Sequence, residues 1–163
     1  MQKSTVYILL GGNLGNLIDT FEKACAHIEL KIGTILRKSA LYSSKPWGFE
    51  SNDQFLNQVL SVETTLEAHQ VMHALLNIEA ILGRTRKQSI KYESRIIDLD
   101  LLFYNDLVTH MSDLTIPHPR LQFRKFTLVP LAEIAPELIH PTLHRTVTEL
   151  LAECKDQSDV KAL

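Results

Sequence analysis

The most restrictive feature of this sequence is a short apolar run, Ile96–Phe103, that two aspartates interrupt. The run is rich in Ile, Leu and Phe, which predicts a buried strand, whereas aspartate is rare in strands and costly to bury without a partner. Side chains alternate across a strand, so Asp98 and Asp100 are predicted to share one face. Ile97 and Leu99 would then fill the opposite face.

Two like charges held side by side favour a bound cation. A hard divalent metal accepts carboxylate oxygens, and Mg²⁺ is usually held by one or two carboxylates together with substrate phosphates. Arg95 precedes the aspartates and offers a planar fork suited to phosphate oxygens. The alternative is a solvated strand face on which Asp98 and Asp100 pair with lysines. The basic segment from Arg84 to Lys91 favours the metal–nucleotide site, because it brings positive charge to the same end of the strand.

The composition argues against several other classes of function. The chain has 163 residues, with 17 Lys and Arg against 19 Asp and Glu, so its formal net charge is -2. That balance favours neither nucleic acid nor an anionic membrane as a partner. No segment approaches the roughly 20 apolar residues that cross a bilayer, and the N-terminus lacks the pattern of a signal peptide. Cys25 and Cys154 are expected to stay reduced, which favours a cytoplasmic location.

Periodic patterns predict a single domain over residues 1–163. Strands are predicted at Thr5–Leu10, Thr34–Tyr42, Phe55–Glu63 and Ile96–Phe103, and helices at Leu17–Leu30 and from the N-cap Thr65 to Gly83. This order is that of an α+β ferredoxin-like βαββαβ sandwich, with a four-stranded antiparallel sheet and helices on one face. Additional short elements follow: Thr146–Glu149 is a capping box that opens a final helix, and the last residues, Lys155–Leu163, are expected to be frayed.

Two loops have both a structural and a functional interpretation. The segment Gly11–Gly15 is glycine-rich, but it lacks the Lys-Ser/Thr pair of a phosphate loop, so a tight turn before a helix is favoured. Ser43–Gln54 is long and contains Trp47 and Phe49. These aromatic side chains could close over a flat ligand, or they could pin the loop to the body of the protein.

Two polar residues further along the chain, Glu79 and His118, occupy unusual positions. Glu79 lies near the C-terminal end of its predicted helix, where the helix dipole disfavours a carboxylate. Either a ligand or an ion pair with Arg84 or Arg86 would compensate for that position. His118 stands between two prolines, which hold the backbone extended and restrict the directions available to its ring.

The run Arg95-Ile-Ile-Asp98-Leu-Asp100-Leu-Leu resembles the signature of the 6-hydroxymethyl-7,8-dihydropterin pyrophosphokinase family. Enzymes of that family move pyrophosphate from ATP to a pterin alcohol. The resemblance extends over nearly the whole chain, because five further motifs follow the family's order and approximate spacing. They are Leu10-Gly-Gly-Asn13-Leu-Gly, Pro46-Trp-Gly48 with Phe55-Leu-Asn57, Ile78-Glu79 with Gly83-Arg84, Ile116-Pro-His118-Pro, and Arg124 with Phe126.

The resemblance implies a site for ATP and two Mg²⁺ ions. Asp98 and Asp100 match the family's metal ligands, and Arg84 and Arg95 match residues that grip phosphates as the site closes. The other matches on the nucleotide side are Glu79, Arg86, Leu101, Thr115, His118 and Arg124. Chemistry of this kind depends on positioning and charge neutralisation, in agreement with a sequence in which no dedicated general base stands out.

The resemblance also implies a pterin site. Phe55 and Phe126 would stack on the two faces of the ring system, and Asn57 would read its edge together with backbone groups around Ser44 to Pro46. The remaining matches are Lys45 and Pro46, next to Ser44, and Trp47, which occupies a position in the closing loop.

Two rival interpretations remain, together with an expectation about partners. A non-catalytic ferredoxin-like module that binds a nucleotide would not need paired carboxylates and two aromatic residues at once. A different ATP-dependent kinase of the same fold would keep the metal site without Asn57 and the aromatic pair. We expect a monomer whose partners are ATP and the pterin, with no nucleic acid or membrane partner.

Overall fold

A computed structural model of the chain describes residues 2–44, 54–83 and 96–163. The strands are β1 (Ser4–Gly12), β2 (Gly33–Lys38), β3 (Tyr42–Ser44), β4 (Phe55–Thr64), β5 (Asp98–Tyr104), β6 (Thr109–Met111), β7 (Leu114–Ile116) and β8 (Lys161–Ala162). The helices are α1 (Leu17–Lys31), α2 (Ala68–Ile81), the 3-10 turn η1 (Leu121–Phe123), α3 (Lys125–Ile134) and α4 (Val147–Glu153).

The main sheet is antiparallel and has the strand order β5-β1-β4-β3-β8, with β2 also paired to β4. The two long central strands, β1 and β4, pair from Ser4↔Thr64 to Gly12↔Leu56. With α1 after β1 and α2 after β4, this arrangement is the predicted α+β ferredoxin-like fold. β6 and β7 form a separate hairpin.

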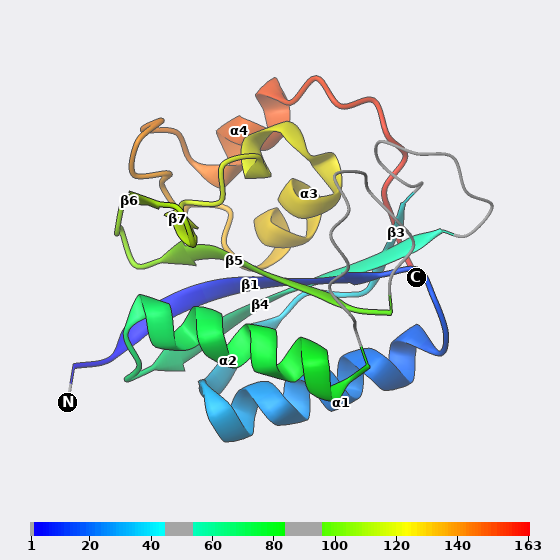
Figure 1. Cartoon of the computed structure of the whole chain (residues 1–163). Coiled ribbons are helices and arrows are strands. Elements are labelled where there is room, and N and C mark those ends of the chain that lie inside the picture. The colour runs from blue at the N-terminus through cyan, green and yellow to red at the C-terminus, as the bar shows by residue number, and fades with distance from the viewer. Residues whose placement is uncertain (1, 45–53, 84–95) are drawn as a thin grey trace.

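The sheet is covered on both faces, whereas the sequence predicted helices on only one. Figure 1 shows α1 and α2 beneath the sheet and α3 and α4 above it. The lower core contains side chains such as Phe21, Ile28 and Leu75. The upper core contains Leu9 of β1 together with Leu128 and other side chains of α3 and α4. α3 is not among the predicted helices because Pro130 lies inside it, and proline normally interrupts a helix.

The predicted strand Thr34–Tyr42 is in fact two strands. β2 ends at Lys38. At the next residue, the hydroxyl of Ser39 accepts a hydrogen bond from the backbone N–H of Val59 at 2.9 Å. The next amide, that of Ala40, donates to the Glu133 carboxylate on α3 at 3.0 Å. The backbone N–H of Ser39 still donates to the carbonyl of Val59 at 2.9 Å, so the pairing with β4 is interrupted after Ser39, where the Glu133 carboxylate binds the next amide.

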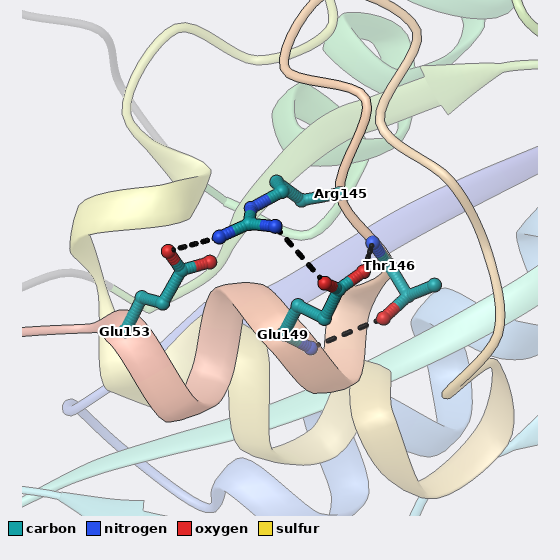
Figure 2. Close-up of polar contacts among 4 residues, drawn as sticks. All are labelled: Arg145, Thr146, Glu149 and Glu153. Carbon is teal, nitrogen blue, oxygen red and sulfur yellow. Dashed lines mark hydrogen bonds and ion pairs between the residues drawn. The ribbon is translucent and has the colours of Figure 1, made fainter.

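Helix starts were predicted with mixed success. Asn16 caps α1, whose predicted start at Leu17 is confirmed. The predicted N-cap at Thr65 is wrong: the cap of α2 is Glu67, whose backbone N–H donates to Gln70 at 2.8 Å. The predicted capping box at Thr146–Glu149 is confirmed. Figure 2 shows its two reciprocal hydrogen bonds, together with Arg145 bridging Glu149 and Glu153.

Two further expectations are corrected at the ends of elements. Gly11 and Gly12 belong to β1, so the glycine-rich segment starts inside a strand and not in a turn. The C-terminal residues expected to be frayed include the short strand β8, which pairs with β3 as Tyr42↔Ala162 and Ser43↔Lys161. Among the described residues, no helix combines the length and apolar character needed to cross a membrane.

Candidate active site

Asp98 and Asp100 lie in β5 on the sheet face opposite α1 and α2. Both side chains are half-buried, while Ile97, Leu99 and Leu101 alternate with them and are buried in the lower core. The predicted alternation is therefore confirmed. Two adjacent carboxylates that keep partial access to solvent are suited to a hard divalent cation.

A β-bulge follows the two aspartates along β5. The register between β1 and β5 shifts between Tyr7 and Ile8, which leaves Leu102 as the extra residue. The carbonyl of Leu102 accepts the backbone N–H of His118 at 3.0 Å. The bulge therefore anchors the segment after β7 beside the strand that bears the carboxylates.

Gly11 lies between Asp98 and Asn57 on three adjacent strands. The register pairs Gly11 with Asn57 on β4 and with Asp98 on β5, so these residues form one row across the sheet. A Cβ atom added at Gly11 would lie 3.1 Å from the Asn57 Oδ1 atom. Neighbouring strands are about 4.8 Å apart, so Asp98 and Asn57 flank a stretch of about 10 Å with no side chain at its centre.

Asn57 is held in one orientation by β3. Its Nδ2 atom donates to the Ser44 hydroxyl at 3.1 Å, and both side chains are buried. Phe55 begins β4, pairs with Ser44 and is half-buried on the same face as Asn57. A fixed amide beside an aromatic ring can read the edge of a flat heterocycle.

His118 is a neutral hydrogen-bonding group next to the carboxylates. Burial lowers the pKa of its ring to about 4, and the Arg124 guanidinium lowers it as well, against an opposing effect of Asp98. Its Nδ1 atom accepts the backbone N–H of Arg120 at 3.2 Å. That acceptor role assigns the ring proton to Nε2, which makes Nε2 a donor.

Arg124 precedes the first residue of α3 and is almost fully buried. Its guanidinium carbon lies 5.6 Å from the centre of the Phe126 ring, a distance at which a cation interacts with an aromatic face. Arg124 and Phe126 therefore present a positive charge and a partly exposed ring together, on the face that bears Asp98 and Asn57.

Glu79 and Leu101 lie on the other side of β5. Glu79 is buried, and its carboxylate accepts the backbone N–H of Leu99 at 2.7 Å, which ties the end of α2 to the strand between the two aspartates. The two explanations considered for this acid, a ligand or an arginine, did not include that contact. Thr115 lies on β7, where its hydroxyl donates to the carbonyl of Met111 at 3.4 Å.

The other predicted site residues lie outside the described part of the chain. They are Lys45, Pro46, Trp47, Arg84, Arg86 and Arg95. Their assignments stay predictions.

The described residues fit a metal ion whose ligands come partly from the protein and partly from a substrate. Within residues 2–44, 54–83 and 96–163, no three His, Cys, Asp or Glu side chains cluster as a complete metal site. Asp98 and Asp100 supply two carboxylates, the number that Mg²⁺ commonly takes from a protein when phosphate oxygens and water fill its other positions.

Gly11 is the site residue that sequence reasoning missed. It was included in a turn, yet it follows the apolar run of β1 without a break. A glycine inside a strand pattern often marks a close approach by a ligand or a neighbouring group. That signal was present in the sequence, but only the strand register shows which residues flank Gly11.

The geometry agrees with a comparison to known families. A family model described as 7,8-dihydro-6-hydroxymethylpterin-pyrophosphokinase (HPPK) matches residues 7–136. The chain belongs to the HPPK family. It is accordingly a diphosphotransferase, as the resemblance in its motifs implied.

Curated relatives of the HPPK family align along most of the chain. A 2-amino-4-hydroxy-6-hydroxymethyldihydropteridine pyrophosphokinase of Synechocystis is 38% identical over 145 residues, which are 88% of this chain and 73% of the relative. The enzyme of that name from Aquifex aeolicus is 38% identical over 150 residues, 92% of each chain. The folic acid synthesis protein fol1 of Pneumocystis carinii is 37% identical over 99% of this chain, which corresponds to 21% of that longer protein.

Solved structures support the fold of the HPPK family. A Plasmodium falciparum HPPK-DHPS triple mutant with SDX-DHP superimposes with a TM-score of 0.77 at 18% identity, over 93% of this chain. An HPPK-DHPS in complex with substrates gives a TM-score of 0.74 at 15% identity. This chain spans less than half of each of those longer chains, 44% and 43%.

Proposed function

We propose that this enzyme transfers pyrophosphate from ATP to the hydroxymethyl group of 6-hydroxymethyl-7,8-dihydropterin, as a step of folate synthesis. The reaction would use two Mg²⁺ ions and release AMP. The observation that carries the proposal is the row Asp98–Gly11–Asn57, in which a carboxylate and a fixed amide lie on one face with no side chain between them. Membership of the HPPK family supports the same reaction.

The proposed chemistry is a single displacement at phosphorus. The pterin hydroxyl oxygen attacks the β-phosphorus of ATP, the bond from that phosphorus to the oxygen of the α-phosphate breaks, and the hydroxyl proton is lost to solvent. Asp98 and Asp100 would hold Mg²⁺, which when bound neutralises charge on the phosphate oxygens and polarises the attacking hydroxyl. The protein's own contribution is then positioning and electrostatics, in which Arg84 and Arg95 are proposed to grip the phosphates.

His118 and Arg124 are proposed to contact the nucleotide. The neutral ring of His118 offers an Nε2–H donor, and Arg124 offers a positive charge already held in place by its surroundings. A fixed donor and a fixed charge stabilise a developing negative charge without reorganisation during the reaction. Glu79, Arg86, Leu101 and Thr115 remain predicted contacts on the nucleotide side.

The pterin is proposed to bind between Phe55 and Phe126, with its polar edge against Asn57. The hydrogen bond to Ser44 fixes the direction of the Asn57 amide, so the site would discriminate by the pattern of donors and acceptors on the ligand. Lys45, Pro46 and Trp47 follow Ser44 in the sequence and are proposed to complete this side. The enzyme is proposed to act as a monomer.

The proposal is tested by incubating the enzyme with ATP and Mg²⁺, with and without the pterin, and measuring AMP together with the mass of the pterin product. AMP that depends on the pterin, accompanied by a pterin diphosphate, is the expected result. ADP in place of AMP would indicate an ordinary kinase. Nucleotide binding without any product would favour a non-catalytic module.

A further inference from the structure

The C-terminal tail, residues 155–163, contacts two parts of the proposed pterin site. The sequence predicted a frayed end here, yet the tail has two fixed points. At the first, the Asp156 Oδ2 atom accepts the backbone N–H of Lys125 at 3.0 Å. At the second, β8 pairs with β3, and the N–H of Leu163 donates to the carbonyl of Leu41 at 2.9 Å.

The first fixed point supplies a helix cap from a distant part of the chain. Arg124 occupies the N-cap position of α3, but its side chain makes no capping hydrogen bond. The Asp156 carboxylate takes that role for the first helical amide, and a negative charge there is favoured by the helix dipole. Lys125 is the residue between Arg124 and Phe126, so the cap acts on the backbone that positions both.

Asp156 is itself preorganised for this contact. Its Oδ1 atom accepts the backbone N–H of Ser158 at 2.9 Å and also the Ser158 hydroxyl. Burial alone would raise the pKa of Asp156, but the hydrogen bonds from Ser158 and Lys125 lower it below its usual range. The carboxylate is therefore charged near neutral pH, and both of its oxygens have donors.

The second fixed point acts on the opposite side of the same site. β3 continues from the residues paired with β8 to Ser44, whose hydroxyl holds the Asn57 amide. Lys161 lies five positions after Asp156, and a fully extended chain of that length reaches about 17 Å. The tail therefore limits how far the start of α3 can move from β3.

We infer that the tail is a strap that sets the width of the pterin site, with Asp156 as a positioning residue for Phe126. This inference rests on the proposed function. The HPPK family match ends at residue 136, so the tail lies outside it. β8 and β5 are the opposite edges of the sheet, four strand spacings or about 19 Å apart, so the strap acts on the pterin side and not on the metal carboxylates.

The test compares Asp156→Ala with Asp156→Asn and with the matched control Asp159→Ala. Asp159 lies in the same tail but is exposed, and it forms a surface ion pair with Lys161 at 3.1 Å. We expect Asp156→Ala to raise the KM for the pterin about tenfold, in keeping with the loss of a cap, and to raise the KM for ATP by a smaller factor through Arg124, which the same cap positions. Asp156→Asn keeps one acceptor oxygen and should recover part of that loss, and Asp159→Ala should match the wild type.

A second variant that ends at Val160 removes β8 and leaves Asp156 in place. It should also raise the KM for the pterin, with kcat lowered less than threefold. An unchanged KM for the pterin in both the truncated chain and Asp156→Ala would overturn the strap, whatever happens to the melting temperature. Equal increases in both KM values would overturn it too. Failure of the proposed function is a separate result, because the wild type itself would then form no pterin-dependent AMP.

Discussion

The two faces of the sheet use the same strands for different purposes. On the lower face, alternate residues of β1, β4 and β5 pack with α1 and α2 into a continuous apolar core. On the upper face, the apolar core formed with α3 and α4 shares the strands with Gly11, Asn57 and Asp98. Apolar packing on the lower face therefore stabilises the strands, while part of the upper face is free of such packing and forms the site. Glu79 connects the lower helix layer to the strand that bears the site, because its carboxylate on α2 accepts the backbone N–H of Leu99 in β5.

The largest expected effect is loss of the carboxylates on the upper face. Asp98→Ala or Asp100→Ala should lower kcat about a thousandfold, a barrier increase of about 4 kcal/mol, because each removes a metal ligand. The melting temperature without Mg²⁺ should change little, since both side chains are only half-buried and their removal does not open the apolar core. Steady-state kinetics and thermal unfolding measure the two effects. Asp106 is exposed in the turn after β5, so Asp106→Ala serves as the control. If both site variants kept more than a tenth of the wild-type activity, the metal assignment would be contradicted.

The opposite result is expected on the lower face. Leu75 is fully buried on α2, so Leu75→Ala should lower the free energy of unfolding by about 3 kcal/mol through lost packing and the cavity it leaves. Its neighbour Leu76 is 38% exposed, and Leu76→Ala should cost less than about 1 kcal/mol. Denaturant unfolding measures both values. Activity per folded molecule should be unchanged, and a specific loss of kcat in Leu75→Ala would show that the two faces are not independent.

Gly11 and Gly12 are adjacent in β1 but face opposite sides of the sheet, so substitutions at the two positions test the difference between the faces. Gly11→Ala places a methyl group against the Asn57 amide, so we expect the KM for the pterin to rise about tenfold, or about 1.4 kcal/mol, with little change in stability. Gly12→Ala places its methyl 2.6 Å from the carbonyl of Ile96 and 2.9 Å from Leu17. It should instead lower the free energy of unfolding by about 2 kcal/mol. If the two variants had the same profile in kinetics and in unfolding, the division between faces would be wrong at this position.

The smallest expected effect concerns the protonation of His118. Its folded pKa of about 4 lies below the ordinary value of 6.5, so between those pH values the unfolded chain binds more protons. His118 should therefore make the free energy of unfolding decrease as pH falls from about 6.5 to about 4, and have no such effect above that range. Histidine NMR titration in the absence of Mg²⁺ measures the midpoint, and His118→Asn should flatten this part of the stability profile. A midpoint near 6.5 would show that the ring is not buried as described.

Local patterns in the sequence predicted much of the fold. The alternation around Asp98, the start of α1 at Leu17 and the capping box at Thr146 are each set by residues within a few positions, and each prediction is confirmed. The errors arose where distant residues decide. The strand pairing is interrupted after Ser39 because Glu133 on α3 binds the next amide, and the start of α3 depends on Asp156, 31 residues further along the chain from Lys125.

The site divides in the same way. The shared face of Asp98 and Asp100 is predictable from the sequence, because the alternation of a strand is a property of the backbone. It also carried the motifs that identify the HPPK family. The three-dimensional fold was needed to show that Gly11 separates Asp98 from Asn57, and that the tail joins α3 to β3. Strand register and long-range hydrogen bonds depend on which segments meet in space, and spacing along one segment does not contain that information.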